Sequence, residues 1–228
     1  MRFRDFDVAF EHGSVPDPRE LSLRTRAFVE AVVTELRARR IDAPWIKLAV
    51  LVAAPGARPT FMPPQPKVGI SVAVATVAAP DSPLTTAVGP AIRPMLAELV
   101  AGTRDLVREA GGWDDPRFWD LVDEVGSHAG PFTAWLPAKT DRRTKVAYHL
   151  TWEFDEDGTR LRLDARQPDG ALSGRTMVGD FPGAWELLPG RAPRVIRLTA
   201  DGVDLLDHAG DIVVAVARPD RVGGAAPR

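Results

Sequence analysis

Large apolar and polar side chains alternate with a period of two between Lys145 and Arg166, and this alternation constrains the fold more than any other feature. Such a pattern is typical of strands that are buried on one face. It is interrupted at Asp157-Gly158, a dipeptide that predicts a tight turn. The expected cross-strand pairs are Phe154–Leu161, Trp152–Leu163, Glu153–Arg162 and Asp155–Arg160. Apolar and charged pairs agree in this register, and a shift by one residue would lose both.

Further turn signals divide the rest of the second half of the chain into short strands. The clearest are Gln167–Gly170 and Asp201-Gly202, which carry the residues that tight turns prefer. The expected strands are Arg175–Val178, Val195–Thr199, Val203–Leu206 and Ile212–Ala217. The second half is therefore predicted to be an antiparallel β meander, followed by a loose polar tail over residues 219–228.

The first half of the chain predicts the element order β-α-β-β-α-α. The expected strands are 2–10, 45–53 and 68–77, and the expected helices are 17–40, 91–110 and 115–125. Asp17-Pro18 and Asp115-Pro116 are typical helix starts, because Asp caps free amides and Pro suits the first helical position. In the strand 68–77 one face carries only small residues, which favours the close approach of a helix.

These elements together predict an α+β fold, with helices packed on one side of a mixed or antiparallel sheet. We expect residues 1–218 to form a single domain, with a possible sub-boundary near 138–143, where proline and charge increase. The segment 54–67 has five prolines and is expected to be a stiff, exposed loop rather than a strand.

Composition excludes several classes of protein. The absence of cysteine excludes disulfides, thiolate metal sites and a cysteine nucleophile. A formal net charge of −2 gives no electrostatic basis for binding nucleic acid. The longest apolar stretch, residues 68–80, is shorter than the roughly 20 residues that a membrane helix needs. We therefore expect a soluble, cytoplasmic protein, and the preference for Arg over Lys with no Asn indicates a GC-rich bacterial genome.

No standard catalytic or nucleotide-binding motif occurs in the sequence, and no cofactor is expected. The catalytic candidates are His128, Asp114 and Asp115, which lie within the aromatic segment 113–135. A histidine near carboxylates and aromatic walls is a possible general base in a pocket. The alternative is that the aromatic residues pack in a core and that His128 only ends a helix.

Two further groups of polar residues are candidate binding sites. Lys145, His149 and Arg166 fall on one end of the polar face of the predicted hairpin, where they would attract a small anion. Asp204, Asp207, His208 and Asp211 provide oxygen and imidazole ligands suited to Mg²⁺ or Mn²⁺. The alternative interpretations are a solvated sheet face for the first group and ordinary turn residues for the second.

Two functions are consistent with this sequence. The first is a non-catalytic protein-binding or accessory module, favoured by the absence of catalytic motifs, the proline-rich loop and the exposed strand edges of a meander. The second is a small-molecule-binding protein or hydrolase-like enzyme with a pocket near residues 113–135. The partner is thus expected to be another protein, with a small ligand as the alternative.

Overall fold

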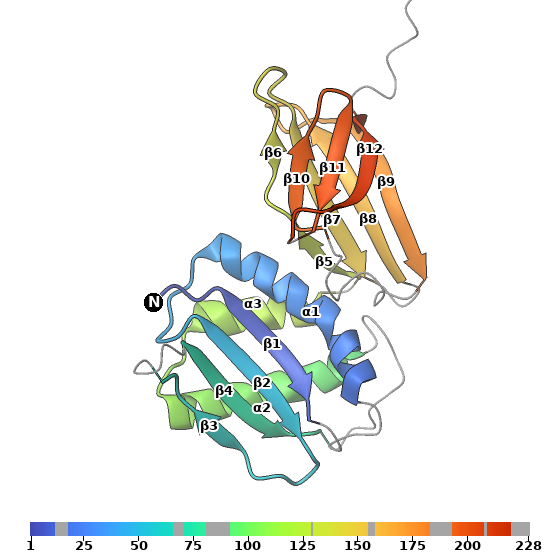
Figure 1. Ribbon diagram of the computed structural model, residues 1–228. Coiled ribbons are helices and arrows are strands. Elements are labelled where there is room, and N and C mark those ends of the chain that lie inside the picture. The colour runs from blue at the N-terminus through green and yellow to red at the C-terminus, as the bar shows by residue number, and fades with distance from the viewer. Residues whose placement is uncertain are drawn as a thin grey trace, which may run out of the picture. The chain divides into compact units, whose positions relative to one another are not determined.

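The computed structural model (Figure 1) describes residues 1–11, 18–65, 71–80, 92–128, 130–154, 158–182, 193–207 and 209–219. The chain divides into two compact units, Met1–Phe132 and Thr133–Arg228. We call them unit 1 and unit 2 and describe each by itself. The division falls before the predicted boundary at 138–143, and the single-domain organisation stays a prediction.

Unit 1 is built on a four-stranded mixed sheet. Its strands are β1 (Asp5–Phe10), β2 (Lys47–Ala53), β3 (Thr60–Met62) and β4 (Val72–Ala78), in the spatial order β1-β2-β4-β3. Strands β1, β2 and β4 are parallel, and β3 pairs antiparallel with β4 at the edge. Strand β4 therefore lies between two strands that precede it in the sequence.

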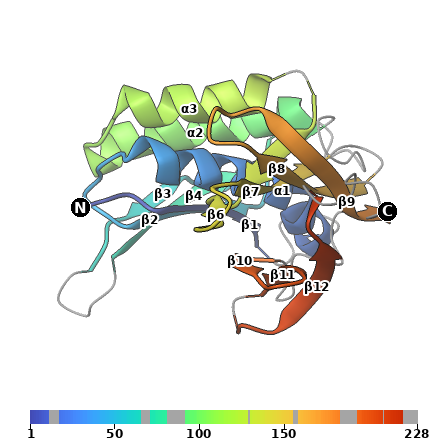
Figure 2. The ribbon, with the colours of Figure 1, turned by 90° about the horizontal axis from the view of Figure 1, so that it is seen from above.

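Three helices cover one face of this sheet: α1 (Pro18–Arg39), α2 (Arg93–Gly111) and α3 (Pro116–Ser127) (Figures 1 and 2). The ring of Phe6 in β1 contacts both Phe28 of α1 and Phe118 of α3. Ala73 and Ala75 of β4 are fully buried on this face, as the small-residue pattern predicted. The α+β architecture with helices on one side of a mixed sheet is confirmed. None of the helices in the described part of the chain is both long and apolar enough to cross a bilayer.

The predicted helix signals agree with the structure where it describes them. Asp115 is the N-cap of α3 and accepts a hydrogen bond from the backbone N–H of Arg117 at 2.9 Å. Gly112 follows α2 in the left-handed conformation with φ 64°, which glycine adopts without a Cβ penalty. Asp17 lies outside the described residues. The aromatic side chains of Phe118, Trp119 and Phe132 are buried, so core packing explains most of the aromatic segment.

The proline-rich segment differs from its prediction, because Thr60–Met62 form the edge strand β3. These three residues lie between Pro59 and Pro63, so they keep the backbone N–H groups that pairing with β4 requires. Phe61 packs against Trp45, with 5.7 Å between the ring centroids. The prolines therefore mark the two ends of this strand, but the prediction of a loop in place of the strand was wrong.

Unit 2 contains two antiparallel sheets. The first has the order β5-β7-β8-β9, with β6 paired to β7, and the second has the order β10-β11-β12. The strands are β5 (Phe132–Trp135), β6 (Lys139–Thr140), β7 (Ala147–Phe154), β8 (Gly158–Arg166), β9 (Leu172–Pro182), β10 (Val195–Leu198), β11 (Gly202–Leu206) and β12 (Ile212–Ala217). The Arg194 guanidinium lies 5.5 Å from the ring of Trp152, which connects the two layers. This arrangement agrees with the predicted meander.

The predicted register of the β7–β8 hairpin is wrong by two residues. Trp152 lies opposite Leu161, and Glu153 lies opposite Arg160. An even shift leaves each side chain on the same face, so the alternation of apolar and polar residues does not distinguish the two registers. The predicted Glu153–Arg162 pair survives as a diagonal ion pair with an N–O distance of 2.6 Å. The alternation therefore predicts which side chains share a face of the hairpin, but it does not determine the register between the two strands.

Candidate functional site

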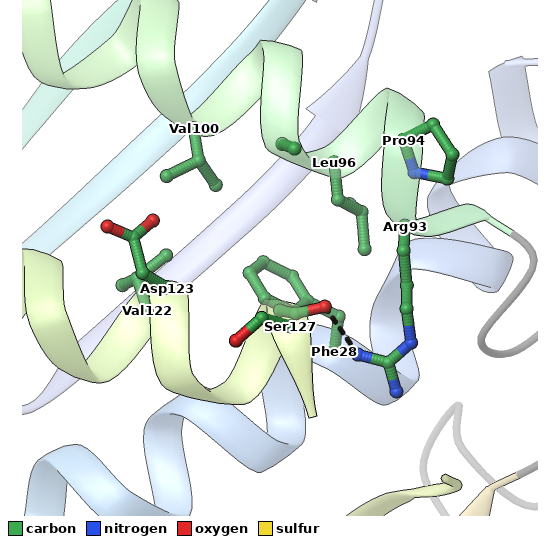
Figure 3. A pocket seen from close by; sticks show the side chains of 10 residues that line it. Phe28, Arg93, Pro94, Leu96, Val100, Val122, Asp123 and Ser127 are labelled. Carbon is green, nitrogen blue, oxygen red and sulfur yellow. Dashed lines mark hydrogen bonds between the residues drawn. The ribbon is translucent and has the colours of Figure 1, made fainter. Parts of the chain in front are cut away.

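The main candidate site is an apolar groove of about 460 Å³ between α2 and α3 in unit 1 (Figure 3). Helix α1 contributes Phe28 to its floor. The lining residues are Phe28, Arg93, Pro94, Leu96, Ala97, Val100, Val122, Asp123, Gly126 and Ser127. We call this feature the α2–α3 groove. Its volume lies within the range of roughly 300–1,000 Å³ typical of ligand sites.

Helical periodicity explains how the sequence forms the walls. On α2 the lining positions are 93, 94, 96, 97 and 100, of which 93, 96, 97 and 100 share one face of a helix. On α3 they are 122, 123, 126 and 127. Ala97 and Gly126 are small residues in the two walls, so they leave space that larger side chains would fill. A Cβ built on Gly126 would lie 3.8 Å from Phe28, in ordinary contact.

The first turn of α2 places Arg93 at one end of the groove (Figure 3). Its guanidinium donates hydrogen bonds to the backbone oxygens of Val125 (3.1 Å), Gly126 and Gly130 (2.7 Å). It also lies 4.3 Å from the ring centroid of Phe132. Burial lowers the pKa of Arg93 from its ordinary value. Arg93 therefore links the start of α2 to the end of α3 and places a positive charge beside an apolar surface.

The other end of the groove carries the opposite charge. Figure 3 shows the Asp123 carboxylate beside Val100, away from Arg93. Asp123 is exposed, and no other residue in the described ranges forms an ion pair with it. The groove is thus apolar along its length, with a cation at one end and an anion at the other.

A second hollow of about 440 Å³ lies at the carboxyl end of β4. It is lined by the loop after β2, the end of β4 and the middle of α2, and its charged lining residue is Glu98. Carboxyl ends of parallel strands are common ligand sites in α/β sheets. The described residues there provide one carboxylate and mainly small or apolar side chains, which gives less chemical definition than the α2–α3 groove.

The structure does not bring the catalytic candidates together. Asp115 precedes α3 and His128 follows it, so the length of the helix, about 18 Å for 12 residues, separates them. Asp115 caps the helix and pairs with Arg117, which lowers the pKa of its carboxyl. Asp114 lies near Arg104, with an N–O distance of 3.5 Å. His128 is exposed and does not line the groove, although it directly follows Ser127.

The anion-binding candidates lie around a carboxylate of the protein itself. His149 lies opposite Asp164, whereas Arg166 lies opposite Ala147. Asp164 is buried and accepts two hydrogen bonds from Arg175, at 2.8 and 3.1 Å. Arg166 also approaches this carboxylate, at 3.9 Å. Lys145 is exposed in the turn before β7 and is not among the residues that pair with Asp164. The positive charges of this face therefore surround a resident anion.

The metal-ligand candidates are used for local structure. Asp204 forms an ion pair with Arg197 at 2.7 Å. Asp207 accepts hydrogen bonds from the backbone N–H groups of Ala209 and Asp211, as in an ordinary turn. His208 lies outside the described residues, and the Asp211 side chain is exposed. Among the described residues, no group of three or more His, Asp or Glu side chains is placed to hold a metal ion.

Sequence reasoning missed the residues that define the groove, above all Arg93 and Asp123. The available signal was the pair of small residues, Ala97 and Gly126, on two helices joined by a short connection.

Comparison of the chain with protein-family models, with curated proteins and with solved structures gives no significant match. The groove must therefore be interpreted from its own chemistry. An open apolar groove with charged ends can bind apolar side chains.

Proposed function

We propose that this protein is a non-catalytic binding module that takes apolar side chains of a partner protein into the α2–α3 groove. The observation that carries the proposal is the apolar lining between two neighbouring helices, with Pro94 and Ala97 exposed at its rim. A groove between helices is a common receptor for the apolar face of a third helix. The location of Asp115 and His128 at opposite ends of α3 supports this proposal over the hydrolase-like alternative.

A groove-filling substitution tests this proposal. Ala97→Trp would occupy the groove from the exposed rim of α2, and Ala110→Trp, at another exposed position of the same helix, is the matched control. Each full-length variant and the wild type are immobilised, and proteins retained from a lysate of the source organism are quantified by mass spectrometry. We expect a protein retained by the wild type and by Ala110→Trp but lost with Ala97→Trp, and direct binding of that protein after purification. If every protein retained by the wild type is also retained by Ala97→Trp, the proposal is contradicted.

The volume of the groove favours one other candidate, a small apolar ligand. Solvent extraction of the purified protein distinguishes the two. A compound that co-purifies with the wild type and with Ala110→Trp, but not with Ala97→Trp, would assign the groove to a small molecule.

A further inference from the structure

The two charges at the ends of the α2–α3 groove have no ion-pair partners within the described residues. Within the described ranges, Arg93 donates to backbone oxygens and stacks on Phe132, and Asp123 forms no ion pair. Each of these two charges lies beside apolar surface and can still bind a group of opposite charge. A ligand that fills the groove would gain from supplying both counter-charges.

Arg93 has hydrogen-bonding capacity left for an acid. An arginine carries five N–H donors, and three bonds to carbonyl oxygens are formed here. Both Nη1 donors are used, together with one on Nη2. Among the described residues, no acceptor is bound by the Nε–H or by the second Nη2–H, and a carboxylate is an acceptor that guanidinium groups bind strongly. Burial lowers the pKa of Arg93, and in the part of the chain that the structure describes no carboxylate forms an ion pair with it.

The length of the groove sets the spacing between the two counter-charges. Helices α2 and α3 run antiparallel, because Arg93 at the start of α2 contacts Gly126 and Arg104 further along α2 pairs with Asp114. The α2 lining spans positions 93 to 100, about 10 Å at 1.5 Å per residue. Asp123 lies at the Val100 end (Figure 3). Two turns of a docked helix cover the same distance, so its side chains at i and i+7 reach opposite ends of the groove.

We propose that the occupant is an amphipathic helix of a partner protein in which an acidic and a basic residue, seven positions apart, flank apolar residues. The acid binds Arg93, the base binds Asp123, and the apolar residues at the intervening i+3 and i+4 positions enter the groove. This inference rests on the proposed function and specifies its partner. The α2–α3 groove combines an apolar lining with two opposite charges, which favours such a helix over a purely apolar molecule.

Selection from a library of displayed 14-residue helical peptides tests the inference with the full-length protein. Peptides are selected on the wild type and counter-selected on Ala97→Trp. We expect the enriched peptides to carry two apolar residues flanked by an acid and a base seven positions apart. Because Arg93 also holds the end of α3, the charge test uses Asp123, whose side chain is exposed and carries no structural bond among the described residues.

Asp123→Lys is expected to weaken the enriched peptides roughly five- to tenfold, since reversal turns an exposed ion pair into a repulsion. Replacing the basic residue of the peptide by Glu should restore affinity for Asp123→Lys. Asp120→Lys, at an exposed position of the same helix outside the groove, is the control and should change affinity less than twofold.

The outcomes separate this inference from the proposed function. Enriched apolar helices that bind Asp123→Lys as well as the wild type would overturn the charge assignment and leave the groove as a protein-binding site. No enrichment over the Ala97→Trp variant would overturn both. A dimer of the wild type that Ala97→Trp dissociates would assign the groove to a second copy of this chain and overturn the inference.

Discussion

Replacement of Arg93 by Met is expected to destabilise unit 1 and to loosen the end of α3. Met has an unbranched apolar side chain of similar length to the aliphatic part of arginine. The substitution removes three hydrogen bonds to the carbonyl oxygens of Val125, Gly126 and Gly130. It also removes the contact with Phe132. Because these oxygens lie near a partly exposed helix end, each bond is assigned the lower part of its usual range, about 0.5–1 kcal/mol. With about 0.5 kcal/mol for the cation–π contact, the expected loss is about 2–3.5 kcal/mol.

The assay combines urea unfolding with hydrogen exchange of the last turn of α3. Arg93→Met should lower the free energy of unfolding and speed exchange there, whereas Arg93→Lys should lose about half as much, because it keeps the charge but not the planar fork. Arg108→Met removes an exposed arginine of the same helix, paired with Asp105, and should change stability by less than about 0.5 kcal/mol. Equal stability and equal α3 exchange in Arg93→Met and the wild type would refute the role given to Arg93.

Further substitutions test other contacts. Gly202→Ala should lower stability by about 1–3 kcal/mol in urea unfolding, because a Cβ there would lie 2.5 Å from the backbone oxygen of Val216. Gly102→Ala, in open space within α2, should instead raise it by about 0.5–1 kcal/mol, and the opposite order would refute the comparison. Asp141 has its pKa lowered to about 2, mainly by an arginine partner, so its stabilising contribution is present above about pH 4 and is lost as the pH falls toward 2. Asp141→Asn should therefore flatten the acid limb of a stability–pH curve. Burial, followed by a nearby arginine, lowers the pKa of His149, so wild-type stability should fall from about pH 7.5 to about pH 5 more than that of His149→Gln.

Local signals in the sequence predicted the elements of the fold well. Asp115-Pro116 marks a helix start through backbone chemistry that does not depend on distant residues. The faces of β7 and β8 followed from alternation, because burial has the same period as the side chains of a strand. The hairpin register did not follow, since a two-residue shift keeps every face and changes only the partners.

The candidate site could not be predicted, because it depends on which helix faces meet. The apolar residues Leu96 and Leu99 of α2 are buried, and Leu96 also lines the groove. Nothing local to α2 indicates that Arg93 would reach backbone oxygens more than 30 residues away. Asp115 and His128 both lie next to one helix in the sequence, and this places them at its opposite ends in the structure.

The insertion of β4 between β2 and β3 has a consequence for the order in which the nascent chain gains structure. Strand β3 has its partner in β4, ten residues further along, so this hairpin can form from a short piece of newly synthesised chain. Strand β2 stays without a neighbour on that side until the hairpin arrives. A ribosome that pauses before Val72 is translated would therefore expose an apolar strand edge, which is the surface that chaperones and aggregating chains recognise.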